Sequence, residues 1–388
     1  MIDFPNIISP LSEKEFFESY YEKGVFLNHV PEKLNEVITN EHLFKFLHKL
    51  DNRYPSVRLV NNGNELDKRL YTSQISIGHH NVKDVINPEK LFELFNNGNT
   101  IVIQAAQYCF NSLSAFCKQI SEKFNFPIQA NIYVTPPNAI GFKPHWDTHD
   151  VLVLQIAGEK NWKLFDFEID LPYRNEPFKN DCKISSTVNK EVELKKGDVL
   201  YIPRGYVHSA SAQKSISCHV TIGILSYRWR DLFATVLKEG NTVSSLRKSI
   251  PFWNGNLDAE IEKIKQELIQ NIKDFDFSNE ISNLYKKRIS NQAQIQNNLH
   301  NNNFELTDNA QFKLNTNYAY HLIVKEESVS LIYSGKTIKF PSALKNILEQ
   351  IINSSAAFSK SDLPSYLDAK GQQTLLKVLV KNHIIILC

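Results

Sequence analysis

A block of closely spaced short strands, from Ile128 to about Tyr227, most constrains how this chain can fold. Within it, side chains alternate with the two-residue period of a β-strand, and turn residues separate the segments. Short strands at close spacing favour a sandwich or barrel over alternating βα units. The expected strands are Ile128–Thr135, His145–Ile156, Asn161–Phe167, Val192–Leu194, Val199–Ile202 and Ser215–Leu225.

His145 and Asp147 lie two residues apart at the start of the second expected strand. If Pro144–Thr148 is extended, both side chains share one face and can reach one metal ion. An imidazole and a carboxylate are two ligands of the 2-His-1-carboxylate triad, which holds non-haem Fe(II). Taken alone, such a pair is more often a surface or hydrogen-bonded core pair. His149 continues the series but would lie too far along the strand, so a supporting or structural role is expected.

His208 is the expected third ligand because of the residues that precede it. Gly197, Pro203, Gly205 and His208 follow the spacing G-x5-P-x-G-x2-H, which resembles the second motif of cupin barrels. The turns in this motif bracket a short strand and deliver the histidine onto the next one. The Asn usual in the motif is replaced by Ala212. With this motif inside the same strand-rich block, the sequence favours a metal site.

Lys160 is the expected partner of a 2-oxoacid co-substrate, whose far carboxylate needs a cation. The H-x-D pattern indicates this chemistry, since many metal-binding cupins that use no 2-oxoacid have H-x-H instead. The chain turns at Ala157-Gly158 and returns through Lys160 and Trp162. A buried ammonium must be paired, and a bound dicarboxylate would supply the partner. A lysine exposed in the Gly158 hairpin is equally compatible with the spacing.

Composition limits the partners and the compartment. The net charge of +2 over 388 residues gives no global reason to expect nucleic acid or an anionic membrane. Five widely spaced cysteines without a C-x-x-C pair favour reduced thiols over disulfides or a structural zinc site. The N-terminus lacks signal-peptide features, and no apolar run approaches the roughly 18 to 20 residues of a membrane span. A cytoplasmic location is therefore expected.

Helical segments flank the strand block. Ser12 and Glu15 form a capping-box pattern at the start of a helix over Ser12–Tyr21. Beyond the block, Leu257–Asp274 carries apolar residues at three- and four-residue steps, typical of an amphipathic helix. The chain then passes into the polar tract NQAQIQNNLHNNN, which ends at Asn303 and is the expected linker.

The C-terminal segment is expected to form a small αβ unit of a kind that is often a winged helix. Strands are expected around a Ser334-Gly335 turn, followed by helices at Ser342–Asn353, Ser361–Ala369 and Gln372–Asn382 and a last strand at Ile384–Leu387. From residue 318 onward there is no Arg and no basic run, so direct nucleic-acid binding is not favoured. The expected domains are therefore residues 1–227, 228–303 and 304–388.

Four segments together make the chain resemble the JmjC ribosomal oxygenases, a cupin-superfamily branch of the Fe(II)/2-oxoglutarate oxygenases. They are NIYVTPP (Asn131–Pro137), PHWDTHDVLVLQIAGEKNW (Pro144–Trp162), GDVLYIPRGYVHSA (Gly197–Ala210) and CHVTIG (Cys218–Gly223). The resemblance implies an α+β fold built on a double-stranded β-helix, the cupin or JmjC barrel. It also implies a helical dimerisation region, hence a homodimer, and a winged-helix-like C-terminal domain.

The same resemblance implies the cofactors and the site residues. Fe(II) and 2-oxoglutarate would be bound, with His145, Asp147 and His208 as metal ligands. Lys160 would hold the C5 carboxylate of 2-oxoglutarate. Asn131, Tyr133 and Thr221 fall where family members line the co-substrate or substrate pocket. Cys218 and His219 are not expected to bind metal.

The implied activity is hydroxylation of a side chain, His or Arg, of a ribosomal protein by an Fe(II)/2-oxoglutarate-dependent dioxygenase. One alternative keeps this chemistry but acts on a dedicated precursor peptide or a small molecule. Another is a catalytically silent cupin-like binding module, against which the intact triad and Lys160 argue. Histone demethylation is chemically adjacent, but the chromatin-reading modules that usually accompany it are not found in this sequence.

Overall fold

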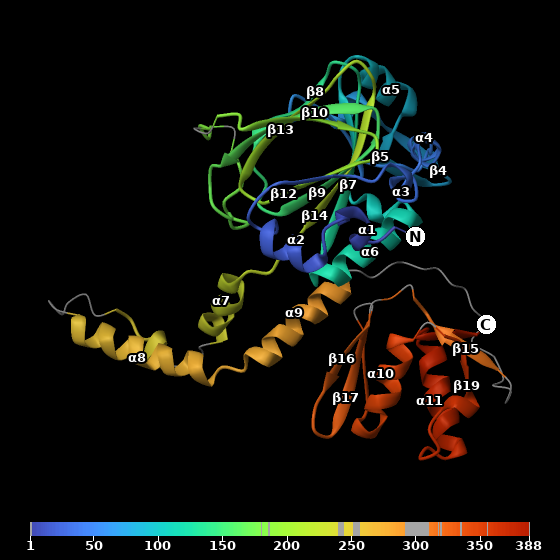
Figure 1. Ribbon diagram of the computed structural model, residues 1–388, viewed down its shortest axis with the longest axis vertical. Helices are drawn as coiled ribbons and strands as arrows, with labels where there is room; N and C mark the ends of the chain where they lie inside the picture. Colours follow the sequence, from blue (N-terminus) through green and yellow to red (C-terminus); the bar gives the residue numbers. More distant parts are fainter. Residues whose placement is uncertain are drawn as a thin grey trace. The chain divides into compact units, whose positions relative to one another are not determined.

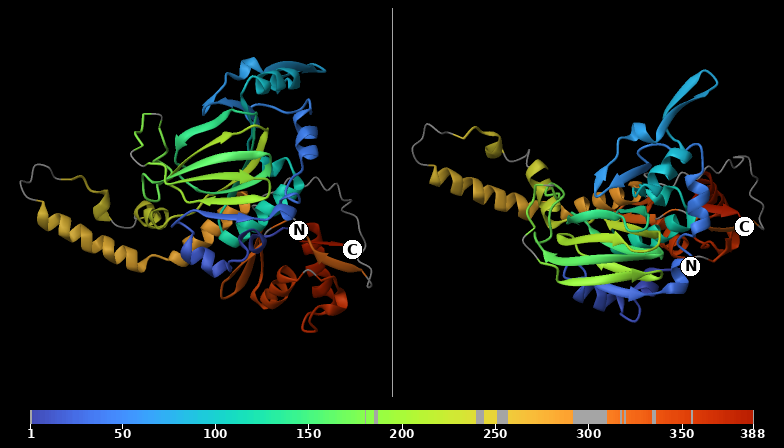
Figure 2. Two further views of the ribbon diagram at one scale, coloured as in Figure 1. Left: turned by 45° about the horizontal axis from the view of Figure 1, so that its top comes forward. Right: turned by 90° about the horizontal axis from the view of Figure 1, so that it is seen from above.

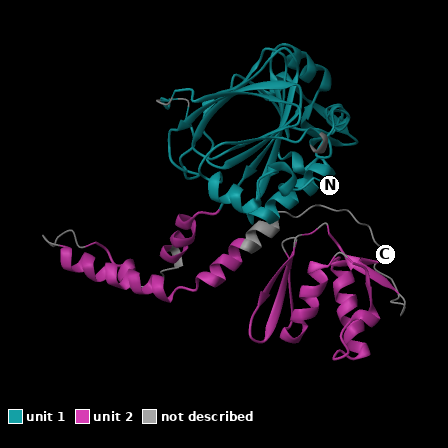
Figure 3. Ribbon diagram, in the orientation of Figure 1, with its two compact units in different colours: residues 1–226 teal, residues 227–388 magenta. Residues whose placement is uncertain are grey.

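The computed structural model describes residues 2–387 apart from 180, 185–186, 240–243, 251–256, 292–309, 317, 319, 334–335 and 355. Two units follow one another along the chain, residues 1–226 and residues 227–388 (Figure 3). Among the described residues, no helix is both long and apolar enough to cross a membrane. The expected linker beyond residue 291 and the expected Ser334-Gly335 turn lie outside the described residues.

Eight consecutive strands of the first unit form a barrel from two antiparallel sheets (Figures 1 and 2). One sheet contains the order β12-β9-β14-β7, and the other has the order β11-β10-β13-β8. Apart from β10 and β11, consecutive strands lie in opposite sheets, which is the winding of a double-stranded β-helix. The strands are β7 (Ile128–Thr135), β8 (Ile140–His145), β9 (Asp150–Ala157), β10 (Glu159–Phe167), β11 (Lys190–Lys195), β12 (Asp198–Ile202), β13 (Tyr206–Ala212) and β14 (Ser217–Ile224). The barrel predicted from the strand block is thus confirmed.

The expected single strand over His145–Ile156 is wrong. β8 ends at His145 and β9 begins at Asp150, in the opposite sheet. The four residues between them cross from one sheet to the other, so Asp147 lies in a connection and not on a strand with His145. Residue alternation alone missed this break, because the segment carries no Gly or Pro after Pro144.

Both faces of β9 are buried, which explains its continuous apolar run. Val151 and Val153 belong to a cluster inside the barrel together with Trp162 and Leu200. Leu152 and Leu154 point the other way, into the core under the N-terminal helices. A strand buried on both faces loses the hydrophobic-polar alternation of a half-exposed one. The barrel interior is therefore lined by odd-numbered residues of β9.

Helices and further strands extend the first unit. The large sheet continues on one side with β1 (Phe26–His29) and on the other with β6 (Thr100–Ile103), β2 (Val57–Asn61) and β3 (Asn64–Glu65). The capping box that starts α2 is confirmed, since the Glu15 amide donates to Ser12 Oγ at 3.2 Å. The other elements are α1 (Phe4–Ile8), α2 (Glu13–Ser19), α3 (Pro31–Leu34), α4 (Asn40–Leu47), hairpin β4 (Thr72–Ile77) and β5 (His80–Ile86), α5 (Pro88–Asn96) and α6 (Asn111–Phe124).

The second unit has a helical part followed by an αβ part. The helices are α7 (Trp229–Glu239), α8 (Asp258–Asp274) and α9 (Phe277–Asn291). The αβ part holds β15 (Gln311–Leu314), β16 (Tyr320–Val324), β17 (Ser328–Tyr333), β18 (Lys336–Pro341), α10 (Lys345–Asn353), β19 (Phe358–Ser359), α11 (Ala369–Lys381) and β20 (Ile385–Leu387). The expected helix over Ser361–Ala369 does not form. Pro364 lies inside it, and only a short 3-10 turn, η6 (Lys360–Asp362), precedes the proline.

Gly158, at the turn between β9 and β10, has no room for a side chain, which can be tested by substitution. Its φ is +63°, and an added Cβ would lie 2.0 Å from the Ile216 carbonyl oxygen. Gly158→Ala is therefore expected to lower the free energy of unfolding by roughly 2–4 kcal/mol, from left-handed strain plus overpacking. Gly78 is the matched control, because its φ is +58° but no atom lies within 4 Å of the added Cβ. Gly78→Ala should cost only about 1–2 kcal/mol in chemical denaturation, and equal losses would contradict the role of the contact.

Candidate metal centre and adjoining cavity

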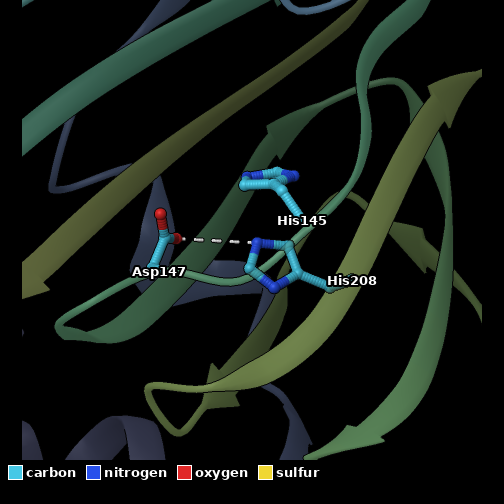
Figure 4. Close-up of side chains that lie close together, drawn as sticks. All are labelled: His145, Asp147 and His208. Atoms are coloured by element: carbon cyan, nitrogen blue, oxygen red, sulfur yellow. Dashed lines mark ion pairs between the residues drawn. The ribbon is translucent and has the colours of Figure 1, made fainter. Parts of the chain in front are cut away.

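His145, Asp147 and His208 converge at one end of the barrel interior (Figure 4). His145 is the last residue of β8, His208 lies on β13, and the two residues are direct cross-strand partners. The histidine rings are 4.5 Å apart between centroids, and His208 Nε2 lies 3.6 Å from Asp147 Oδ2. One ligand atom from each residue fits within a 4.8 Å span. The three residues expected as metal ligands are thus brought together, although Asp147 arrives from a loop.

Each histidine of this group is oriented by a backbone carbonyl two residues earlier in the chain. His145 Nδ1 lies 2.7 Å from the Lys143 carbonyl oxygen, and His208 Nδ1 lies 3.0 Å from that of Tyr206. A carbonyl can only accept, so both Nδ1 atoms carry the proton in these hydrogen bonds. The Nε2 lone pairs are therefore left for a metal, as is usual for histidine ligands.

The electrostatics of the group suit a divalent cation. Burial, reinforced by the neighbouring His145, lowers the pKa of His208 to about 4, so its ring is neutral at pH 7. Burial opposes ionisation of Asp147, but the imidazoles of His149, His145 and His208 outweigh it and hold the pKa of the carboxyl below its ordinary value. At neutral pH the site thus offers the neutral imidazole of His208 and the carboxylate of Asp147 in the forms that bind a metal.

Lys160 lies in the barrel interior and not in an exposed hairpin. It is only 2% exposed, on β10 of the small sheet. Its ammonium donates to Thr135 Oγ1 at 3.1 Å, and burial lowers its pKa to about 7. Among the described residues no carboxylate pairs with it. The structure therefore decides between the two interpretations of Lys160 in favour of a buried cation.

Two buried nitrogen atoms near Lys160 complete a polar patch that sequence reasoning missed. Trp162 Nε1 and His219 Nδ1 are both inaccessible to solvent and have no hydrogen-bond partner among the described residues. The two rings lie 5.6 Å apart between centroids, and the Lys160 charge contributes to lowering the pKa of His219, after burial. The two-residue period of the last strand could have revealed His219, since it places this residue on the same face as Thr221.

The other expected pocket residues also face the barrel interior. Tyr133 on β7 stacks on His219 at 5.0 Å between centroids, with an interplanar angle of 9°. Asn131 Oδ1 accepts from the Ala105 amide at 3.1 Å, and Thr221 is its cross-strand partner on β14. Burial and the nearby Asp147 charge raise the pKa of Tyr133 to about 12, so its hydroxyl stays protonated. The alternation of these three residues with the outer core residues of β7 and β14 places all three on the interior face of the large sheet.

A cavity of about 590 Å³ opens over the metal residues. Residues 62–64, 142–149, 177, 178, 182 and 184 line it. Trp146 holds the segment that contains residues 177 and 178 over the site. Its Nε1 donates to the Glu176 carbonyl at 3.2 Å, and its ring lies 5.0 Å from that of Phe178 between centroids. Among the described lining residues, Asp147 is the only carboxylate, and the remainder are mainly aromatic, amide and apolar. The cavity can thus admit a side chain from outside to the metal residues.

His149 packs against the backbone of β14. A Cβ added at Gly223 would lie 2.6 Å from its ring, so this glycine leaves the space that the imidazole fills. His149 also lines the cavity and contributes to the low pKa of Asp147. It is not part of the three-residue group that can share a metal, in agreement with the supporting role expected for it.

The fold and the three-residue group define a candidate metal centre in a cupin-type barrel. Residues 105–232 match the family model described as JmjC domain. Its curated relatives include the bifunctional lysine-specific demethylase and histidyl-hydroxylase NO66 of Brugia malayi, 29% identical over 63% of this chain and 35% of the relative. The protein of the same name from Drosophila persimilis is 27% identical over 74% of this chain and 41% of the relative. The chain thus spans well under half the length of these relatives.

Solved structures agree at the level of the fold. The ribosomal oxygenase YcfD of Escherichia coli superposes with a TM-score of 0.55 at 15% identity, covering 97% of this chain and 98% of that one. A structure of YcfD in complex with cobalt and 2-oxoglutarate gives the same TM-score, identity and coverage. The predicted resemblance to JmjC ribosomal oxygenases and the cupin-type fold are confirmed.

Proposed function

We propose that this protein is an Fe(II)/2-oxoglutarate-dependent oxygenase that hydroxylates a side chain of a ribosomal protein. The observation that carries the proposal is the triad of His145, Asp147 and His208 in the same barrel interior as the buried cation Lys160. When bound, Fe(II) and 2-oxoglutarate supply the oxidising power to insert one atom of O2 into a substrate C–H bond, with succinate and CO2 as products. The chain's own residues bind, orient and shield the reactants.

The donor set fits Fe(II). Two imidazoles and one carboxylate on one side of an ion form the facial triad of non-haem Fe(II) oxygenases, which leaves positions for co-substrate and oxygen. The carbonyl-bound Nδ1 atoms of His145 and His208 keep both rings in the tautomer that binds through Nε2. A structural zinc site would instead close its coordination with four protein ligands.

The polar patch fits a dicarboxylate. Lys160 provides a buried positive charge, Thr135 a hydroxyl, and Trp162 and His219 two unpartnered ring nitrogens. Buried polar groups without partners are costly, and an anion that accepts from them would remove that cost. We therefore propose that Lys160 binds the C5 carboxylate, with Asn131, Tyr133 and Thr221 lining the path between this patch and the metal.

Proton uptake should accompany co-substrate binding. Lys160 has a pKa of about 7 in the free protein, so it is mostly neutral at pH 8, whereas a bound carboxylate favours the ammonium form. Binding of 2-oxoglutarate should therefore weaken as pH rises above 7, by up to about tenfold per pH unit. Calorimetry at pH 8 in buffers of different ionisation enthalpy would measure the proton taken up. Identical binding enthalpies in all buffers would contradict the assignment.

The cavity favours an uncharged substrate side chain. A guanidinium entering a closed site needs a carboxylate partner, and Asp147 is the only one among the described lining residues and is committed to the metal. Phe178 and Trp146 instead offer ring surfaces on which an imidazole can pack. We therefore propose histidine over arginine as the hydroxylated residue.

The test is co-substrate turnover with ribosomal proteins present. Protein loaded anaerobically with Fe(II) is supplied with 2-oxoglutarate and O2, with and without ribosomal extract, and succinate is measured. We expect extract to raise succinate formation and one ribosomal peptide to gain one oxygen atom on a histidine. A peptide pair with His or Arg at that position then tests the residue preference.

The alternatives give different outcomes. Turnover without any oxidised ribosomal peptide would support the oxygenase activity but indicate a precursor peptide or small molecule as the substrate. Absence of both metal binding and turnover would favour the binding module. An oxidised arginine would overturn only the preference for histidine.

We also propose that residues 228–287 mediate a homodimer. α8 is amphipathic, yet none of its residues is buried within this chain. On α7, Phe233 and Leu237 are exposed one helical turn apart, and Trp229 lies one turn earlier. Sedimentation should show a dimer that Leu237→Glu weakens. Leu70→Glu, in the first unit, is the matched control, since Leu70 is 53% and Leu237 58% exposed.

The remaining assignments are part of the same proposal. The division into domains at residues 1–227, 228–303 and 304–388, the winged-helix character of the last of them and a cytoplasmic location follow from the sequence patterns and the resemblance. Limited proteolysis with mass mapping would test the boundaries, with cleavage expected in the polar tract that ends at Asn303.

A further inference from the structure

A buried cluster of charges lies behind the metal centre. Arg204 donates through one guanidinium nitrogen to Asp150 Oδ2 at 2.8 Å and to Glu22 Oε1 at 2.5 Å. Asp150 is fully buried, and its other oxygen accepts from the Tyr201 hydroxyl at 2.9 Å. Tyr201 in turn accepts from the Glu22 amide at 2.9 Å. The cluster thus connects the N-terminal segment with two strands of the large sheet.

The two central members of this cluster lie beside the segments that carry metal ligands. Asp150 opens β9, three residues after Asp147, and Arg204 lies in the turn before β13, four residues ahead of His208. The Gly205 amide donates to the Asp147 carbonyl at 3.0 Å, and the Arg204 amide lies 3.4 Å from Asp150 Oδ1. Side-chain and backbone contacts therefore tie the loop of Asp147 to the turn that leads to His208.

The cluster does not take part in the site directly. Asp150 and Tyr201 alternate with residues of the inner cluster, so both face the helices and not the barrel interior. Neither Asp150 nor Arg204 lines the cavity over the metal residues. Burying such charges is seldom a net gain in stability compared with apolar residues. A constraint on geometry is a better reason to have them here.

We propose that the Asp150–Arg204 ion pair is a positioning device that sets the separation between Asp147 and His208. This inference rests on the proposed function, because it concerns the metal that the triad would bind. Asp147 comes from a loop and has no strand ladder to hold it, whereas His145 and His208 are cross-strand partners. The pair supplies the missing constraint by fixing the Asp150 end of that loop against the neighbouring turn.

Arg204→Lys and Asp150→Asn test the proposal in the full-length protein. Lysine keeps the positive charge but replaces the planar guanidinium, one nitrogen of which contacts both Asp150 and Glu22, with an ammonium on a flexible stem. Affinity for Co(II) is measured by competition with a chromophoric chelator, without substrate or turnover. We expect each variant to bind Co(II) about 10- to 100-fold more weakly than the wild type, as for other groups that orient ligands. Glu22→Gln, which leaves the Asp150 contact in place, should have a smaller effect.

A control separates positioning from stability. Ile120 on α6 packs in the apolar core that also contains Tyr201, so Ile120→Ala would leave a cavity there. This variant should have a lower Tm but unchanged affinity for Co(II). Wild-type affinity in Arg204→Lys and Asp150→Asn, whatever their Tm, would overturn the positioning role. Weakened binding in Ile120→Ala to the same extent would also overturn it. Failure of the wild type to bind Co(II) would instead overturn the proposed function.

Discussion

His208→Ala is expected to abolish metal-dependent turnover. The ligand atoms of His145, Asp147 and His208 lie within 4.8 Å of one another, and removal of one imidazole leaves two donors, too few to hold Fe(II) with open positions. Activity should fall by roughly 10³-fold or more, because loss of groups that merely orient ligands already costs about 10- to 100-fold. The measurement is succinate formation at saturating 2-oxoglutarate over a range of Fe(II) concentrations.

A binding measurement independent of activity accompanies this prediction. Metal at about 100 times its Kd should stabilise the wild type by about 2.7 kcal/mol, and this increment should vanish in His208→Ala. His80→Ala is the control, since His80 is an exposed residue on β5, outside the triad. A metal-induced rise in Tm that survives in His208→Ala would show that the ion binds elsewhere.

The barrel and the three residues of the triad could be predicted because they rest on local patterns. Two-residue alternation and short spacing between turns identify strands without knowledge of their partners. The Gly and Pro residues of the turns before His208 likewise indicate that this histidine lies at the start of a strand. β9 shows the limit, since it is buried on both faces and its apolar run merged with the preceding segment into one expected strand.

The parts that could not be predicted depend on contacts between distant segments. Asp150 and Arg204 are 54 residues apart, and nothing in either local sequence indicates that they pair. The proximity of Trp162 to His219 follows from the fact that β10 and β14 both face one interior, which alternation within either strand does not reveal. Even the break after His145 depends on β8 and β9 belonging to opposite sheets.

Lys160→Met is expected to weaken 2-oxoglutarate binding while it stabilises the free protein. Truncating one partner of a buried, hydrogen-bonded charge pair costs about 2–5 kcal/mol, so Kd should rise between about 30-fold and several thousand-fold. In the free protein the same ammonium is buried, with Thr135 as its hydrogen-bond acceptor and no carboxylate partner among the described residues. Methionine of similar length removes that cost. Calorimetric titration and chemical denaturation measure the two effects.

Lys160→Met should also change how the free energy of unfolding depends on pH. The folded-state pKa of Lys160, about 7, lies below the ordinary 10.5, so between these values the unfolded chain binds more protons than the folded one. The contribution of Lys160 to stability therefore rises from pH 7 to pH 10.5, and Lys160→Met should remove that slope. Lys163→Met is the matched control, because Lys163 lies on the same strand but outside, 48% exposed and paired with Glu191 at 3.4 Å. If both variants keep full 2-oxoglutarate affinity, the anion is held elsewhere in the barrel. If Lys160→Met alone loses affinity and gains stability, the buried ammonium is its binding group.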